Sequence, residues 1–85
     1  MTNFQAKIQV NLRPSVLDPA GEATKSAANK LGIKGLNKLR IGKFIDLEIE
    51  ALNKEDARNQ VEILCDRLLA NPVIEDWSLE LFQAD

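Results

Sequence analysis

The chain has 85 residues, with 11 basic and 13 acidic side chains, no histidine and one cysteine. This length accommodates a single domain, residues 1–85, with a small core. The composition excludes an intrachain disulfide, a standard zinc site and a histidine-activated nucleophile, and the slight acidic surplus argues against nucleic-acid binding.

The first half begins with a predicted strand and a predicted helix. Residues 4–12 alternate between apolar and polar side chains, which predicts a strand with one buried face. Residues 18–31 are typical of a helix, because Asp18 suits the N-cap, Pro19 the first helical position and Gly32 the left-handed position after the end. The apolar stripe of this helix is mostly alanine, which predicts close packing against the sheet.

Residues 36–51 place apolar side chains at odd positions and charged ones at even positions, with an interruption at 42–44. Two structures fit this pattern: one long strand bent or bulged at Gly42, or a hairpin with a three-residue loop at 42–44. A single strand over 39–51 would be about 43 Å long, whereas the following helix would be about 24 Å. The apolar overhang predicts that a second chain covers it.

The second half contains the clearest helix. Residues 55–70 carry one apolar stripe, which includes Cys65, with Asn53 as the N-cap and Asn71-Pro72 as a left-handed stop. Residues 73–82 alternate again and predict a last strand. The order β-α-β(β)-α-β predicts an α+β two-layer sandwich, similar to the ferredoxin-like arrangement, with both helices on one face and the sheet extended by dimerisation.

Few side chains are candidates for chemistry. Cys65 lies on the buried stripe, where a thiol is inert. The acidic residues at 46, 48 and 50 are interpreted as a solvated face. Arg40 and Lys43 either guard a strand edge or contact a partner. The loop over 13–21 either borders a binding region at the end of the sheet or only turns the chain.

Three segments in order resemble one known family. They are SVLDPAG at 15–21, RIGKFIDL at 40–47 and LLANPVIEDW at 68–77. Together they resemble PurS, the small subunit of phosphoribosylformylglycinamidine (FGAM) synthase of purine biosynthesis. The resemblance covers nearly the whole chain, although residues 33–37 look slightly extended and Trp77 stands where tyrosine is more usual.

The resemblance implies a three-part carbon-nitrogen ligase that converts FGAR, glutamine and ATP to FGAM, glutamate, ADP and phosphate. A glutaminase subunit would release ammonia, and a large subunit would use ATP and magnesium. This chain would be a dimer or tetramer in the cytoplasm that bridges the other subunits and helps enclose ammonia transfer. We expect it to supply no catalytic residue, cofactor or metal ligand, and to bind neither nucleic acid nor membrane.

The residues that we expect to contact the larger subunits lie in two of these segments and beside them. They are Arg13, Asp18, Pro19, Gly21, Arg40, Gly42 and Lys43. The alternative is a regulatory module of the ACT type that binds a small molecule. Its Asp-Arg-Pro-Gly loop is only partly matched, because Leu12 replaces the acid and Ser15 replaces the glycine.

Overall fold

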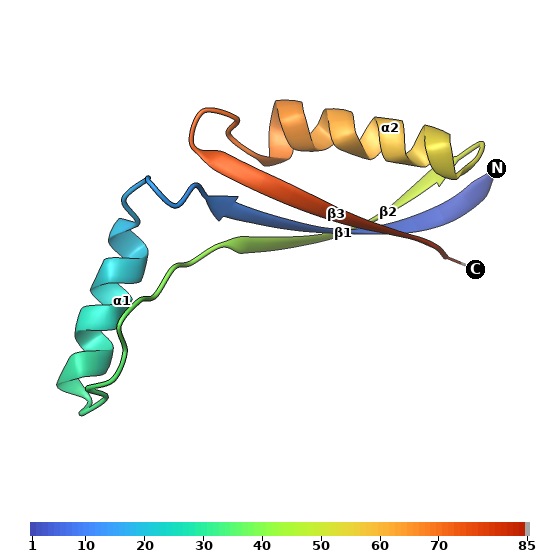
Figure 1. The fold of residues 1–85 in the computed structure, drawn as a ribbon. Helices are drawn as coiled ribbons and strands as arrows, with labels where there is room; N and C mark the ends of the chain where they lie inside the picture. The colour runs from blue at the N-terminus through green and yellow to red at the C-terminus, as the bar shows by residue number, and fades with distance from the viewer. Residues whose placement is uncertain (85) are drawn as a thin grey trace.

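The computed structural model describes residues 1–84, which form three strands and two α-helices in the order β1-α1-β2-α2-β3 (Figure 1). The elements are β1 (Thr2–Leu12), α1 (Pro19–Lys30), β2 (Lys43–Ala51), α2 (Lys54–Leu64), a π-helical turn continuing α2 (Cys65–Leu69), and β3 (Glu75–Gln83). None of the helices in this range is long and apolar enough to cross a membrane.

β1 is the central strand of an antiparallel sheet whose order is β2-β1-β3. Ile8 in the middle of β1 lies opposite Ile45 of β2 and Leu79 of β3. Even-numbered residues of β1 therefore share a face with odd-numbered residues of both neighbours. This arrangement confirms the alternation that predicted a strand at each end of the chain.

The core lies between this face and α2, which runs across the sheet (Figure 1). Its buried apolar residues are Phe4, Ala6, Ile8, Val10, Ala51, Ala57, Val61, Cys65, Ala70 and Leu81. The opposite face carries mostly charged and amide side chains and has no helix over it. The predicted two-layer α+β architecture of the ferredoxin-like type is thus confirmed, with α2 as the covering layer.

The ends of α2 follow partly from local sequence. Asn53 accepts a hydrogen bond from the Asp56 N–H at 2.8 Å, which confirms the predicted N-cap. The helix ends through the π-helical turn, where the Ala70 N–H donates to the Cys65 carbonyl at 3.0 Å. The expectation of a left-handed Asn71 is wrong, because within residues 1–84 positive φ occurs only at glycine, at Gly32.

α1 does not pack on the sheet, so the expectation from its alanine stripe is wrong. The loop after β1 carries the chain past the end of the sheet before the helix begins (Figure 1). Gly21 is the one buried residue of α1, and the alanines at 20, 23 and 27 are exposed. We call residues 13–42 the arm, and residues 33–42 within it the extended segment.

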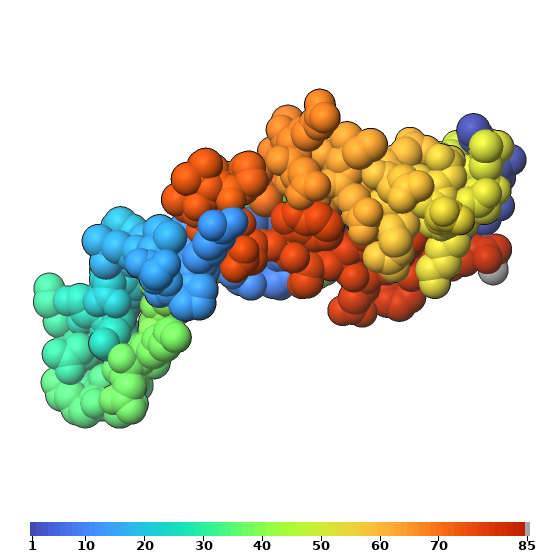
Figure 2. All heavy atoms as spheres, turned by 45° about the horizontal axis from the view of Figure 1, so that its top comes forward, coloured from blue at the N-terminus to red at the C-terminus, as the bar shows by residue number. Residues whose placement is uncertain are grey.

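The arm gives the molecule an elongated outline, visible in Figure 2, with extents of 53 × 28 × 14 Å. The radius of gyration is 16.8 Å, compared with roughly 12 Å for a compact domain of this length. A hollow of about 250 Å³ lies between α1 and the extended segment. The arm therefore encloses no core of its own.

The hairpin alternative for residues 36–51 is wrong. The extended segment returns along α1 and continues into β2 at Lys43 without reversing (Figure 1). The other alternative, one continuous strand, is closer to the observed structure, although only residues 43–51 pair in the sheet. Ile41 and Phe44, on either side of the point where β2 begins, are 46% and 58% exposed.

Candidate subunit-contact site

The structure brings all seven candidate contact residues to the junction between the sheet and the arm. Arg13 follows β1, while Asp18, Pro19 and Gly21 form the start of α1. The remaining three, Arg40, Gly42 and Lys43, lie where the extended segment enters β2. Residues separated by almost 30 positions in the sequence are therefore neighbours in space, and the junction is one local structure.

Asp18 ties the two sides of the arm together. One carboxylate oxygen accepts the Gly21 N–H at 3.0 Å, which is the predicted N-cap, with Pro19 at the first helical position as expected. The other oxygen accepts the Ile41 N–H at 2.7 Å. Asp18 is also buried, so both of its bonds are shielded from water. It therefore fixes the extended segment against the helix start.

The two glycines allow close backbone approach at this junction. A Cβ on Gly21 would lie 2.5 Å from the Leu39 carbonyl oxygen and 2.6 Å from Asp18 Oδ2. A Cβ on Gly42 would lie 2.7 Å from the Val10 carbonyl oxygen. Neither glycine has a positive φ, so space and not backbone conformation explains these two glycines.

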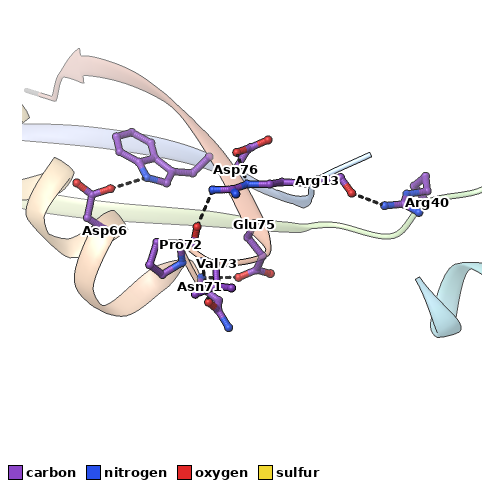
Figure 3. A network of polar contacts seen from close by, with 9 residues as sticks. Arg13, Arg40, Asp66, Asn71, Pro72, Val73, Glu75 and Asp76 are labelled. Carbon is purple, nitrogen blue, oxygen red and sulfur yellow. Dashed lines mark hydrogen bonds and ion pairs between the residues drawn. The ribbon is translucent and has the colours of Figure 1, made fainter. Parts of the chain in front are cut away.

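Arg40 is turned toward its own chain. Its Nη2 donates to the carbonyl oxygens of Arg13 at 2.9 Å and Val16 at 2.8 Å, the former drawn in Figure 3. The guanidinium therefore stabilises the loop after β1. Lys43 is different: its ammonium is exposed and lies 4.0 Å from Glu75, which leaves it accessible to a partner.

A second polar network, which sequence reasoning missed, supports the same junction (Figure 3). Arg13 donates to the Pro72 carbonyl at 2.6 Å and forms an ion pair with Asp76 at 3.2 Å. Beside it, the Trp77 indole N–H donates to Asp66 at 3.0 Å. Composition and periodicity give no signal for these contacts, because they join residues as many as 63 positions apart.

Cys65 is fully buried, as predicted. Burial raises the pKa of its thiol, and the nearby carboxylates of Asp66 and Glu62 act in the same direction. The neutral thiol is a poor nucleophile and metal ligand. Within residues 1–84, no three side chains of the metal-binding types converge on one point.

Charge is strongly divided between the two parts of the molecule. The arm contains six of the eleven basic residues but only two of the thirteen acidic ones. It therefore has a net charge of +4, and the remainder of the chain has −6. Several arm cations bind carbonyl groups, as Lys25 does with the Asn37 carbonyl at 2.9 Å. These bonds leave the positive charge uncompensated, so the arm attracts acidic surfaces.

The pKa of Asp18 should report whether the extended segment is bound to the start of α1 through the Ile41 N–H. The Ile41 N–H and, less strongly, the Gly21 N–H hold the pKa of Asp18 below its ordinary value of 3.8, because both hydrogen bonds favour the charged carboxylate. Burial of Asp18 opposes this shift, and the charge of Arg40 assists it. Because the folded-state pKa is the lower one, the stabilisation is present above the unfolded-state value. It is lost as the pH falls through the folded-state value. NMR titration of the carboxyl should give this low pKa.

Variants of Asp18 should separate its two bonds. Asparagine keeps one acceptor oxygen, so Asp18→Asn should retain the bond to Gly21 and lose that to Ile41. Hydrogen exchange of the Ile41 amide should then accelerate while the Gly21 amide stays protected. Asp18→Ala should expose both amides. An unchanged Ile41 amide in both variants would contradict the role assigned to Asp18.

Comparisons with known proteins agree with this structure. Residues 5–83 match the family model described as PurS: phosphoribosylformylglycinamidine (FGAM) synthase. The PurS subunit of Synechocystis is 47% identical over 79 residues, covering 93% of this chain and 79% of the relative. That of Bacillus subtilis is 38% identical over 78 residues, covering 92% of each chain.

Solved structures give the same result. A crystal structure of Bacillus subtilis PurS has a TM-score of 0.86 at 38% identity, covering 94% of this chain and 99% of that one. A chain in a structure described as PurLQS from Thermotoga maritima has a TM-score of 0.87 at 39% identity, covering 96% and 100%. The chain therefore belongs to the PurS family, whose members are subunits of phosphoribosylformylglycinamidine synthase.

Proposed function

We propose that this chain is a non-catalytic small subunit that bridges the glutaminase and the ATP-dependent subunit of FGAM synthase and helps enclose ammonia transfer. The supporting observation is the structural match to one chain of the PurLQS structure, which is covered over its full length. The residue inventory points the same way. The chain has no histidine, and its only thiol is buried with a raised pKa.

In this proposal the chemistry belongs to the partners. The glutaminase releases ammonia from glutamine, and the large subunit uses ATP and magnesium to activate the formamide oxygen of FGAR. Ammonia then displaces the phosphate, and the overall products are FGAM, glutamate, ADP and phosphate. The small subunit contributes assembly and water exclusion, which protects the reactive intermediate from hydrolysis. In this proposal the complex works in the cytoplasm.

We further propose that the chain acts as a dimer, or as a tetramer built from it. The arm has no core of its own, and large apolar side chains remain exposed on both parts of the molecule. Ile41 and Phe44 are examples near the junction, and Ile63 of α2 is 56% exposed. A second copy that covers such surfaces would remove apolar area from water.

The regulatory-module alternative is not favoured, because the matched family model spans residues 5–83 and is that of PurS. The arginine of the loop that resembles the ACT motif is also engaged in contacts within its own chain. Its Arg13 guanidinium is bound to Pro72 and Asp76.

Alanine variants at the junction test the bridging role. With all three purified subunits, Arg40→Ala should loosen the loop after β1, and Lys43→Ala should remove an accessible charge. We expect each to weaken complex formation about tenfold. Lys30→Ala is the matched control, because Lys30 is an exposed arm cation at the far end of α1.

The readout is co-purification together with two activities. A bridging defect should lower glutamine-dependent FGAM formation while activity with added ammonium salt stays unchanged. Unchanged assembly and unchanged glutamine-dependent activity in both variants would overturn the assignment of this junction.

A further inference from the structure

The face of the sheet opposite α2 is uncovered (Figure 1) and strongly acidic. Odd residues of β1, 3 to 11, share this face with even residues of β2, 44 to 50, and of β3, 76 to 82. We call this surface the open face. Its five carboxylates and the single ammonium of Lys7 give it a net charge of −4. The carboxylates belong to Asp46, Glu48, Glu50, Asp76 and Glu80.

The chain itself neutralises little of this charge. In the sheet register Lys7 lies opposite both Asp46 and Glu80, but it forms an ion pair with neither. Within residues 1–84 the one ion pair of the open face joins Asp76 to Arg13, which follows β1. Exposed carboxylates without cations of their own attract a basic surface. Those with no side-chain hydrogen bond or ion pair in that range are Glu48, Glu50 and Glu80.

An exposed aromatic ring lies among these charges. Phe82 of β3 is 45% exposed and lies opposite Gln5 of β1, and the Lys7 ammonium is 6.0 Å from its ring centroid. Aromatic side chains are enriched in protein interfaces, where a ring enclosed by the partner contributes much of the binding free energy. The open face therefore combines an apolar anchor with charges that surround it.

The open face and the junction suit two different partners. A chain that bridges two subunits needs two separate contact surfaces, because two proteins cannot occupy the same one. The arm, which forms one side of the junction, has a net charge of +4, and the open face has the opposite sign. Opposite charges favour one partner at each surface and repel the other, so they fix which subunit binds where.

We propose that the open face docks on a basic surface of one larger subunit of FGAM synthase, and that the junction contacts the other. This inference rests on the proposed bridging function and specifies one of its two surfaces. The carboxylates steer the basic partner and raise the rate of association. Phe82 enters an apolar pocket of that partner and slows dissociation.

Neutralising two carboxylates tests the charge of the open face. Glu48→Gln/Glu80→Gln keeps the size of both side chains and removes two negative charges. With each purified larger subunit, surface plasmon resonance should show association with one of them slowed about tenfold at low salt. The effect should shrink at high salt, which screens exposed charges. The matched control, Glu55→Gln/Glu62→Gln, removes two charges from α2 on the covered face and should associate like the wild type.

Two single variants test the anchor and the division between partners. Phe82→Ala should dissociate about tenfold faster from the subunit that the double variant affects, with little change in association. Lys43→Ala, at the junction, should instead weaken binding to the other subunit. Loss of binding to the same subunit in both cases would overturn the assignment of two surfaces to two partners.

The remaining outcomes separate this inference from the bridging function. Wild-type kinetics in Glu48→Gln/Glu80→Gln and in Phe82→Ala would overturn the docking surface, as would equal slowing by the control. A change confined to self-association, measured by sedimentation, would assign the open face to a second copy and would also overturn the proposal. Each of these results leaves bridging intact. Failure of the wild-type chain to bind either larger subunit would overturn the proposed function itself.

Discussion

Ile8→Ala is expected to destabilise the protein by about 2 to 5 kcal/mol in the free energy of unfolding. Ile8 is fully buried at the centre of the central strand, between Ile45 and Leu79 and beneath α2. Removing three carbons there leaves a cavity that two hydrogen-bonded neighbours prevent from collapsing. Urea denaturation followed by circular dichroism, at one fixed protein concentration, measures the change.

Val73→Ala is the matched control for this prediction. Val73 is 76% exposed in the turn before β3, so its truncation should change stability by no more than about 0.5 kcal/mol. Equal losses in the two variants would mean that the core does not lie where the structure places it.

Gly21→Ala should destabilise the arm, although alanine normally favours a helix by about 1 kcal/mol over glycine. The new Cβ would meet the Leu39 carbonyl oxygen at 2.5 Å and Asp18 Oδ2 at 2.6 Å. The extended segment must then move away from α1, and the Asp18 bond to the Ile41 N–H is lost with it. Overpacking of this kind costs about 1 to 3 kcal/mol. Amide exchange and backbone chemical shifts over residues 37–42 should report the displacement.

Gly35→Ala separates this steric effect from the general effect of adding a methyl group. A Cβ at Gly35 would meet no atom within 4 Å, and its φ is not positive. We expect it to be neutral or slightly stabilising. Unchanged spectra in Gly21→Ala would mean that the close approach of Leu39 to the helix is absent in solution.

The sheet and α2 could be predicted because their patterns are strictly local. Apolar and polar side chains alternate over residues 4–12 and 73–82 because every second side chain faces the core. The pairing of β1 with β3 confirms both strands. The stripe containing Val61 and Cys65 faces that same core. The caps at Asp18 and Asn53 also follow from one residue and the turn after it.

The position of α1 could not be predicted in this way. Small residues on one helix face are compatible with packing on a sheet, on another segment or on another chain, and here the loop directs α1 away from the sheet. The choice between a hairpin and a continuous chain was equally undetermined, because both place the same odd residues on one face. The Asp18 to Ile41 bond decides it, and this bond spans 23 positions.

The candidate site was predicted as a set of residues but not as a structure. Segments resembling a family marked Asp18, Gly21 and Arg40, and all three lie at the junction. The structure assigns them to internal contacts first, since Arg40 binds two carbonyl groups of its own chain. The Arg13 contacts to Pro72 and Asp76 carried no sequence signal, because an ion pair between exposed residues leaves no periodic pattern.

The isolation of α1 from the sheet also has a kinetic consequence. Because α1 buries only one residue and no arm residue belongs to the core, the arm can open while the core stays packed. We therefore expect the arm and the sheet to unfold as separate cooperative units, with hydrogen exchange and proteolysis of the arm starting from the native state. A brief digestion should cut the free chain within residues 33–38 long before the sheet unfolds. Binding partners that cover the arm should remove this cleavage, so protease resistance reports whether the subunit is assembled.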